Sequence, residues 1–339
     1  MTNLNGDDSD MGGVNGSNDS RGDAPKEDAS NKTMLNEAVV QTSHMAARTR
    51  RSHPWASAGT VVSSIWHTGG GKYAMVVIGL WVAVSVVSLF WTPYQLLATD
   101  GYHVWSSPSA AHPLGTDGVG SDVLSWLMAG SRTNLAIALL TVCVAAALGL
   151  LLVAAMVSRN SAFASTSVVV VDALISLPTV LIALILTVPF GASAAVIVVS
   201  CGFAYGMNLA RILRPAALLA ARSPYVEASL WAGARPIRVF FTHVLPNTLP
   251  VLSVQLSMSA GTSLLAEAGL TYLGVGVGSG VPSWGHSLAT SVRFISIYPT
   301  AVLWPGLVVT VVVVALNLFG DALRDAIDPL TNPALRNIA

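Results

Sequence analysis

Six apolar stretches dominate this chain of 339 residues, and each is long enough, or nearly so, to cross a bilayer as a helix. The hydrocarbon core is about 30 Å thick and a helix rises about 1.5 Å per residue, so about 20 apolar residues suffice. The stretches cover 74–91, 135–157, 166–188, 192–209, 251–270 and 301–318. They lack the strict alternation of barrel strands, and in lipid every backbone amide needs an internal partner. The sequence therefore predicts an all-α membrane protein with six transmembrane helices.

Composition agrees with a membrane location and separates a polar tail from the rest. Hydrophobic residues make up 53% of the chain and charged residues 10%, against about 25% charged in an ordinary soluble domain. Residues 1–55 are rich in Gly, Asn, Ser and Asp, with almost no apolar runs. Such a segment buries too little apolar surface to offset its chain entropy. We therefore expect a disordered cytoplasmic tail over 1–55 and a transmembrane domain over 70–330.

The distribution of Lys and Arg predicts the orientation. Positive residues stay preferentially on the cytoplasmic side of a membrane protein. With the N-terminus inside, fifteen of the 17 Lys and Arg residues fall on the cytoplasmic side, and only Arg132 and Arg293 fall outside. Both termini are therefore expected in the cytoplasm.

The cytoplasmic segment 211–250 is too polar for a span and too well patterned for a disordered loop. Ser223 is expected to cap a short helix, Pro224–Ala232, whose first residue is a proline. Glu227 lies in the first turn, where the helix dipole favours a negative charge. Gly233 is expected to end the helix.

A helix this short is marginal in water, so it needs a surface, either the bilayer interface or a groove in another protein. A second helical piece is expected to run to Val244, before Pro246 and Pro250 break the chain ahead of the fifth span.

The same segment resembles the EAA loop of permease subunits of bacterial ABC importers. The resemblance rests on Glu227, Ala228 and Ser229, then three residues, then Gly233, then nine residues and the run 243–246. The family pattern is Glu-Ala-Ala, three residues, Gly, nine residues, Ile, one residue, Leu-Pro. This chain departs from it at Ser229 and at His243.

Three further blocks resemble the C-type subunit of the dipeptide and oligopeptide permeases. Residues 112–125 precede the second span. Residues 265–285 cover the end of the fifth span and the loop after it, and residues 317–329 cover the end of the sixth span and the segment after it. The resemblance extends over about residues 70–330. Departures occur at Ser121 and Trp126, where the family usually has Arg.

The resemblance implies a type I ABC importer permease fold in the bacterial cytoplasmic (plasma) membrane. The implied partners are a homologous permease subunit in a heterodimer, two ABC ATPase subunits, an extracytoplasmic solute-binding protein and membrane lipid, with no nucleic acid. ATP and Mg²⁺ would be bound by the ATPase subunits, and this chain would bind no cofactor. The implied function is import of dipeptides or oligopeptides, driven by ATP hydrolysis in the partner subunits.

The resemblance also implies that the short helix is the coupling helix, seated in an ATPase groove. Its expected contact residues are Tyr225, Glu227, Ala228, Ser229, Leu230, Gly233 and Ala234, with Leu245 and Pro246 at the end of the loop. We expect Glu227 to stabilise the loop or to contact the ATPase, the alternative being an ordinary capping carboxylate. Gly233 is expected to permit the sharp turn between helices.

Three residues within the spans are candidates for the translocation path. A lone carboxylate in the bilayer is costly, so Asp172 and Glu267 are expected to face the bundle or a wet cavity. The alternative for each is a carboxylate bonded to a neighbouring helix. Ser259 belongs to a small, polar face of the fifth span, which fits a water-filled route or close packing against the partner subunit equally well.

Other classes of activity find little support. Gly69–Lys72 is not a phosphate loop, because Tyr73 replaces the required Ser or Thr and a span follows directly. The seven histidines show no close metal-ligand spacing, and no intramembrane hydrolase pair is evident. Two alternatives stay open: a same-family importer of nickel, glutathione or oligosaccharide, and an ion-coupled secondary transporter.

Overall fold

The computed structural model describes residues 58–278 and 280–327, and all of them belong to one unit of the chain. The tail predicted over 1–55 lies outside these residues. The described part is helical, with one isolated bridge between Thr116 and Asp122 and no strand. Its elements are α2 (Ala58–His67), α3 (Gly69–Phe90), α4 (Val123–Met156), α5 (Ser161–Ile175), α6 (Thr179–Phe190), α7 (Ala194–Ala221), α8 (Pro224–Trp231), α9 (Pro236–Val239), the π-helical turn η1 (Phe240–Val244), α10 (Leu245–Tyr272), α11 (Trp284–Val292) and α12 (Thr300–Ile327).

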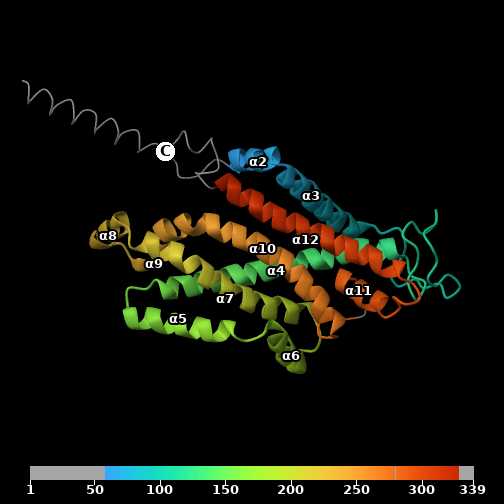
Figure 1. Ribbon diagram of the computed structural model, residues 1–339. Coiled ribbons are helices and arrows are strands. Elements are labelled where there is room, and N and C mark those ends of the chain that lie inside the picture. The colour runs from blue at the N-terminus through green and yellow to red at the C-terminus, as the bar shows by residue number, and fades with distance from the viewer. Residues whose placement is uncertain (1–57, 279, 328–339) are drawn as a thin grey trace, which may run out of the picture. The chain divides into compact units, whose positions relative to one another are not determined.

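Five helices are long and apolar enough to cross a membrane. They are α3, α4, α7, the continuous run Pro236–Tyr272 and α12. In Figure 1 these helices run lengthwise, with α8 and α9 at one end and the loop 91–122 and α11 at the other. We refer to these as the α8 end and the α11 end.

The third predicted span is not one straight helix, so that prediction is wrong in detail. The segment consists of α5 and α6, which are bent by 82° at a short break. Pro178 lies in the break with extended backbone angles, φ −61° and ψ 130°. A proline disfavours helical angles in the residue before it, so the helix ends ahead of Leu177. The pair counts as a sixth span only if it is taken as one bent segment.

The prediction that Pro246 and Pro250 break the chain is also wrong. The helix continues from α9 through η1 into α10. The Leu245 amide donates to the Phe240 carbonyl, five residues back, which is the bond of a π turn. Pro246 follows this turn directly, at the start of α10, and Pro250 lies inside α10.

Glycines allow α4 and α7 to pack closely at the centre of the bundle. A Cβ on Gly149 would lie 2.7 Å from Leu209 Cδ2, and a Cβ on Gly202 would lie 2.6 Å from Val144 Cγ1. Small residues let helices in a membrane approach each other in this way. The small, polar face of α10 packs against α12 of the same chain, where the Ser257 hydroxyl donates to the Leu316 carbonyl at 2.9 Å.

Candidate functional site

The segment at the α8 end forms the short helix that the sequence predicts, almost to the residue. Helix α8 spans Pro224–Trp231, with Glu227 in its first turn. The predicted cap is wrong, because the Ser223 hydroxyl donates to the Ala220 carbonyl at 2.6 Å instead of accepting from the amides of α8. The Ala220 carbonyl at the end of α7 also accepts from the Ser223 amide at 3.2 Å, so Ser223 closes the end of α7 with both its amide and its hydroxyl. The amides of Val226 and Glu227 bond to the Ser223 backbone carbonyl.

Gly233 ends α8 as predicted. Its φ is +86°, in the left-handed region that glycine adopts without steric cost. The Gly233 amide donates to the Leu230 carbonyl at 3.0 Å, and the Ala234 amide donates to the Ser229 carbonyl at 3.1 Å. These bonds satisfy carbonyls that a helix end leaves without partners.

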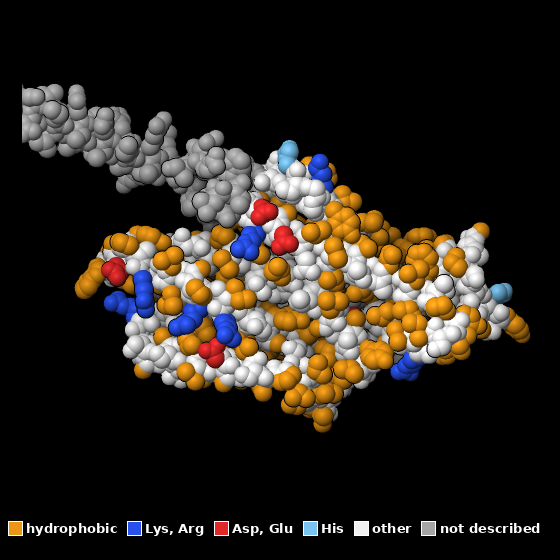
Figure 2. Space-filling view, viewed as in Figure 1, with side chains coloured by type: hydrophobic (Ala, Val, Ile, Leu, Met, Phe, Trp, Pro, Cys, Tyr) orange, Lys and Arg blue, Asp and Glu red, His pale blue; other side chains and the backbone are white. Residues whose placement is uncertain are grey.

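Helix α8 is held by one buried residue and presents the others outward. Val226 is 2% exposed, whereas Trp231 is 86% exposed. Glu227 and Ala228 are also exposed. The Glu227 carboxylate forms no hydrogen bond or ion pair with the described residues, and only the Glu227 backbone is hydrogen-bonded. Glu227 and Trp231 are one helical turn apart, so the carboxylate and the indole lie on the same exposed face of α8. Figure 2 shows charged side chains gathered over the half of the bundle that carries α8.

The two departures from the EAA pattern contact each other. The Ser229 hydroxyl lies 3.2 Å from His243 Nε2, and the His243 and Tyr225 rings lie 5.8 Å apart. Asn247 Nδ2 donates to the Tyr225 hydroxyl at 3.2 Å and to the His243 carbonyl at 2.7 Å. This cluster ties α8 to η1 and to the first turn of α10. Sequence reasoning missed Asn247; its place one turn after His243 on a helix is a signal that could have found it.

Asp172 and Ser259, two of the predicted path residues, lie on different elements and in different surroundings. Asp172 on α5 is half exposed, and its Oδ1 lies 3.9 Å from Arg211 Nε on α7. Ser259 is buried, and its hydroxyl donates to the Gln255 carbonyl within α10 at 2.8 Å. The structure does not bring these two residues together.

Glu267 is fully buried in a junction of three helices. Asn134 Nδ2 on α4 donates to Glu267 Oε2 at 3.1 Å, and the Thr271 hydroxyl donates to Oε1 at 3.0 Å. Helix α11 also approaches the carboxylate closely, since a Cβ on Gly285 would lie 2.7 Å from each Glu267 carboxylate oxygen. Asn134 Oδ1 in turn accepts from the Trp284 amide at 3.1 Å. Of the two alternatives for Glu267, the geometry favours a carboxylate bonded to neighbouring helices.

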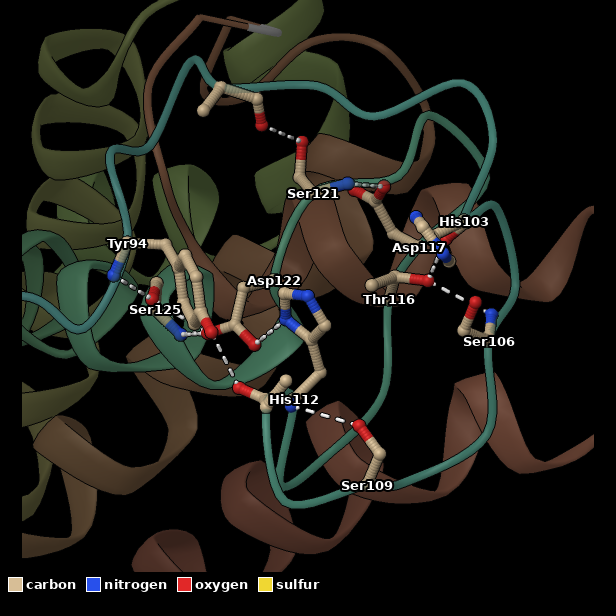
Figure 3. Close-up of polar contacts among 12 residues, drawn as sticks. Tyr94, His103, Ser106, Ser109, His112, Thr116, Asp117, Ser121, Asp122 and Ser125 are labelled. Carbon is tan, nitrogen blue, oxygen red and sulfur yellow. Dashed lines mark hydrogen bonds and ion pairs between the residues drawn. The ribbon is translucent and has the colours of Figure 1, made fainter.

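The loop 91–122 forms an ordered cap at the α11 end (Figure 3). Asp122 caps α4 by accepting from the Ser125 amide at 2.8 Å, and it also contacts His112 Nδ1 at 2.9 Å. Asp117 Oδ1 accepts from the Ser121 amide at 2.8 Å. The block 112–125 that carries the resemblance is therefore built from short-range polar contacts. The two residues that depart from the family pattern here are Ser121 and Trp126. The Ser121 hydroxyl donates to the Ala98 carbonyl at 3.4 Å, and Trp126 lies in the first turn of α4.

The described residues hold no group of three or more His, Cys, Asp or Glu side chains placed to bind a metal ion. Cys201 is buried and Cys143 is exposed, and neither forms a disulfide.

Comparison with known proteins gives one family and several relatives. The family model described as "Binding-protein-dependent transport system inner membrane component" matches residues 145–333. A probable peptide ABC transporter permease protein of Sinorhizobium fredii is 38% identical over 234 residues, which are 69% of this chain and 80% of the relative. The dipeptide transport system permease protein of Escherichia coli K12 is 33% identical over 282 residues, 80% of this chain and 93% of the relative. The nickel transport system permease protein of the same organism is 30% identical over 268 residues, 79% of this chain and 96% of the relative.

Proposed function

Because the chain belongs to the family of binding-protein-dependent transport system inner membrane components, the permease subunits of ABC transporters, we propose that it imports short peptides in an ATP-driven complex. In this complex the chain forms the translocation path with a homologous permease. Two ABC ATPase subunits bind ATP and Mg²⁺, and an extracytoplasmic solute-binding protein delivers the peptide. The chain itself holds no cofactor.

We propose α8 as the element that couples the ATPase subunits to the transmembrane helices, and the main support is the exposed face of this helix. The face presents Glu227, whose carboxylate has no partner among the described residues, beside Trp231, which is 86% exposed. Val226 and the cluster around His243 fix α8 to the rest of the chain. A force applied to α8 therefore passes through η1 into α10, one continuous helix from Pro236 to Tyr272. Closure of the ATPase pair would move α8 and, with it, α10.

The proposed orientation follows the Lys and Arg residues. The α8 end then faces the cytoplasm together with both termini, and the α11 end faces outward. The arginines of α7 and of the α8 to α9 segment support this orientation: Arg211, Arg214, Arg222, Arg235 and Arg238.

We propose peptides as the substrate because two relatives, one named for peptide and one for dipeptide transport, are 38% and 33% identical to this chain. The relative named for nickel transport is 30% identical and marks nickel as the second candidate. Among the predicted path residues, Asp172 suits a path role best, since its carboxylate is half exposed and only loosely paired with Arg211. Ser259 and Glu267 are buried and suit positioning roles.

Site-directed cross-linking tests the coupling proposal. In a Cys143→Ser background, Ala228→Cys places an exposed thiol on α8, and Val119→Cys places a matched exposed thiol at the α11 end. We expect the Ala228→Cys protein to cross-link to a co-purified ATPase subunit with a yield that changes on ATP binding, and the Val119→Cys protein not to do so. Equal yields at the two positions, or no ATPase product from Ala228→Cys, would contradict the proposal.

A further inference from the structure

A cavity of about 350 Å³ lies under the cap at the α11 end. This volume falls within the range of about 300 to 1,000 Å³ that is typical of small-molecule sites. Its walls come from the cap, the first turn of α4, α11 with the segment after it, and the start of α12. Its aromatic and ionisable lining side chains are Trp105, Asp117, Trp126, His286 and Phe294.

Trp105 is held in the cavity wall in a conformation that is costly for its residue type. Its φ is 53°, the one positive φ of a non-glycine residue in the described part of the chain. The Trp105 amide donates to the Asp117 carbonyl at 3.0 Å, and the indole stacks on Tyr298 at 4.9 Å and packs on Phe294 at 5.1 Å. Strain of this kind persists where the surroundings enforce it, and it concentrates at functional sites. The cap therefore presents a fixed aromatic wall.

Asp117 is the one charged side chain among the described residues that line the cavity. Its Oδ1 accepts from the amides of Val119 and Ser121, and neither of its oxygens forms an ion pair with a described residue. Burial and the nearby Arg293 hold the pKa of His286 below its usual range, against the opposing effect of Asp117, so the imidazole is neutral near pH 7. The walls thus carry one negative charge beside aromatic faces, an arrangement that attracts an organic cation.

Trp126 supplies a second aromatic face of the cavity. Its ring lines the cavity and stacks on His286 with the centroids 6.0 Å apart, and its Nε1 is buried away from solvent.

We propose that this cavity binds a short peptide with a free N-terminus, whose ammonium group pairs with Asp117 and whose side chain packs among Trp105, Trp126 and Phe294. The choice of ligand rests on the proposed function. In the proposed orientation the cavity opens on the outer side, where it would receive the peptide before translocation.

Calorimetry on the full-length chain in lipid nanodiscs, with the subunits that accompany it and without solute-binding protein, tests this proposal. The probes are the dipeptide Ala-Phe and its N-acetylated form, which lacks the ammonium group. We expect Ala-Phe to bind at least about tenfold more tightly than the acetylated form, since a charge-assisted pair is lost. Asp117→Asn keeps the Oδ1 acceptor for the loop amides and removes the charge, so it should erase this preference. Asp100→Asn, an exposed carboxylate of the same loop outside the cavity, should leave it unchanged.

Trp126→Phe provides a second, independent variant. It removes part of the aromatic wall, keeps a ring and breaks no hydrogen bond within the protein, so folding should be retained. We expect Ala-Phe to bind severalfold more weakly because its side chain loses part of this wall, whereas Trp81→Phe, which makes the same change at a residue that does not line the cavity, should have no effect.

Equal binding of Ala-Phe to the wild type, Asp117→Asn and Trp126→Phe would overturn the cavity proposal, as would no binding at all. ATP-driven uptake of Ala-Phe measured on the same preparations separates the two proposals. Uptake that persists while these binding results fail would leave the proposed function intact, whereas uptake of nickel in place of the peptide would refute the proposed function itself.

Discussion

Replacing Asn134 by Ala should be among the most damaging changes in the bundle. The Asn134 side chain is fully buried and donates to Glu267 Oε2 at 3.1 Å while accepting from the Trp284 amide at 3.1 Å. The change leaves a buried carboxylate oxygen and a buried backbone amide each short of one partner. Each loss costs about 1 to 3 kcal/mol, so the free energy of unfolding should fall by roughly 2 to 6 kcal/mol.

Denaturation of the purified chain by SDS in mixed micelles, followed by tryptophan fluorescence, measures this loss. Ser259→Ala is the matched control on α10, because its buried hydroxyl bonds only to the Gln255 carbonyl of the same helix. We expect that control to cost less than about 1 kcal/mol. If Asn134→Ala and Ser259→Ala lower the free energy of unfolding equally, the junction does not hold α4, α10 and α11 together as described.

Three further outcomes follow from the geometry. Gly233→Ala should lower the free energy of unfolding by about 1 to 2 kcal/mol, because φ is +86° there. Gly269→Ala is the control: a Cβ would meet no atom within 4 Å at either glycine, but Gly269 is helical, so this change should be neutral or stabilising in the same denaturation assay. Ser229→Ala and His243→Ile should each lower peptide uptake, and the double variant should lose less than the sum of the two, since they share one contact. Calorimetric binding of Ala-Phe should hold steady down to the ordinary pKa of histidine, about 6.5, and weaken only at lower pH, because the pKa of His286 is lowered and its charge appears in the cavity only there; His286→Gln should remove this dependence.

The spans could be predicted from the sequence because length and hydropathy are local properties. Five of the six apolar stretches correspond to helices long enough to cross a membrane. The third stretch forms a bent pair of helices and not one straight helix, because hydropathy does not register the effect of Pro178 on the backbone before it. The break expected at Pro246 is absent. The π turn of η1 accommodates the altered hydrogen bonding ahead of this proline, so the helix continues.

The short helix α8 shows how far local signals reach. Pro224 and Gly233 define its ends in the sequence as they do in the structure, because both act through their own backbone angles. The partner of the Ser223 hydroxyl was predicted wrongly, because the end of α7 competes for the same group.

The long-range contacts of the candidate sites could not be predicted. Asn134 and Glu267 are 133 positions apart in the sequence, and only the packing of α4 against α10 brings them together. The same holds for the cavity at the α11 end, where Trp105 packs on Phe294 and Trp126 stacks on His286. No spacing rule within one segment relates such residues.

Transport into proteoliposomes tests the central claim most directly. The complex that contains this chain should accumulate labelled Ala-Phe when ATP, Mg²⁺ and the loaded solute-binding protein are supplied, and accumulation should stop when ATP is replaced by a non-hydrolysable analogue. Accumulation driven by a proton or sodium gradient in the absence of ATP would contradict the account.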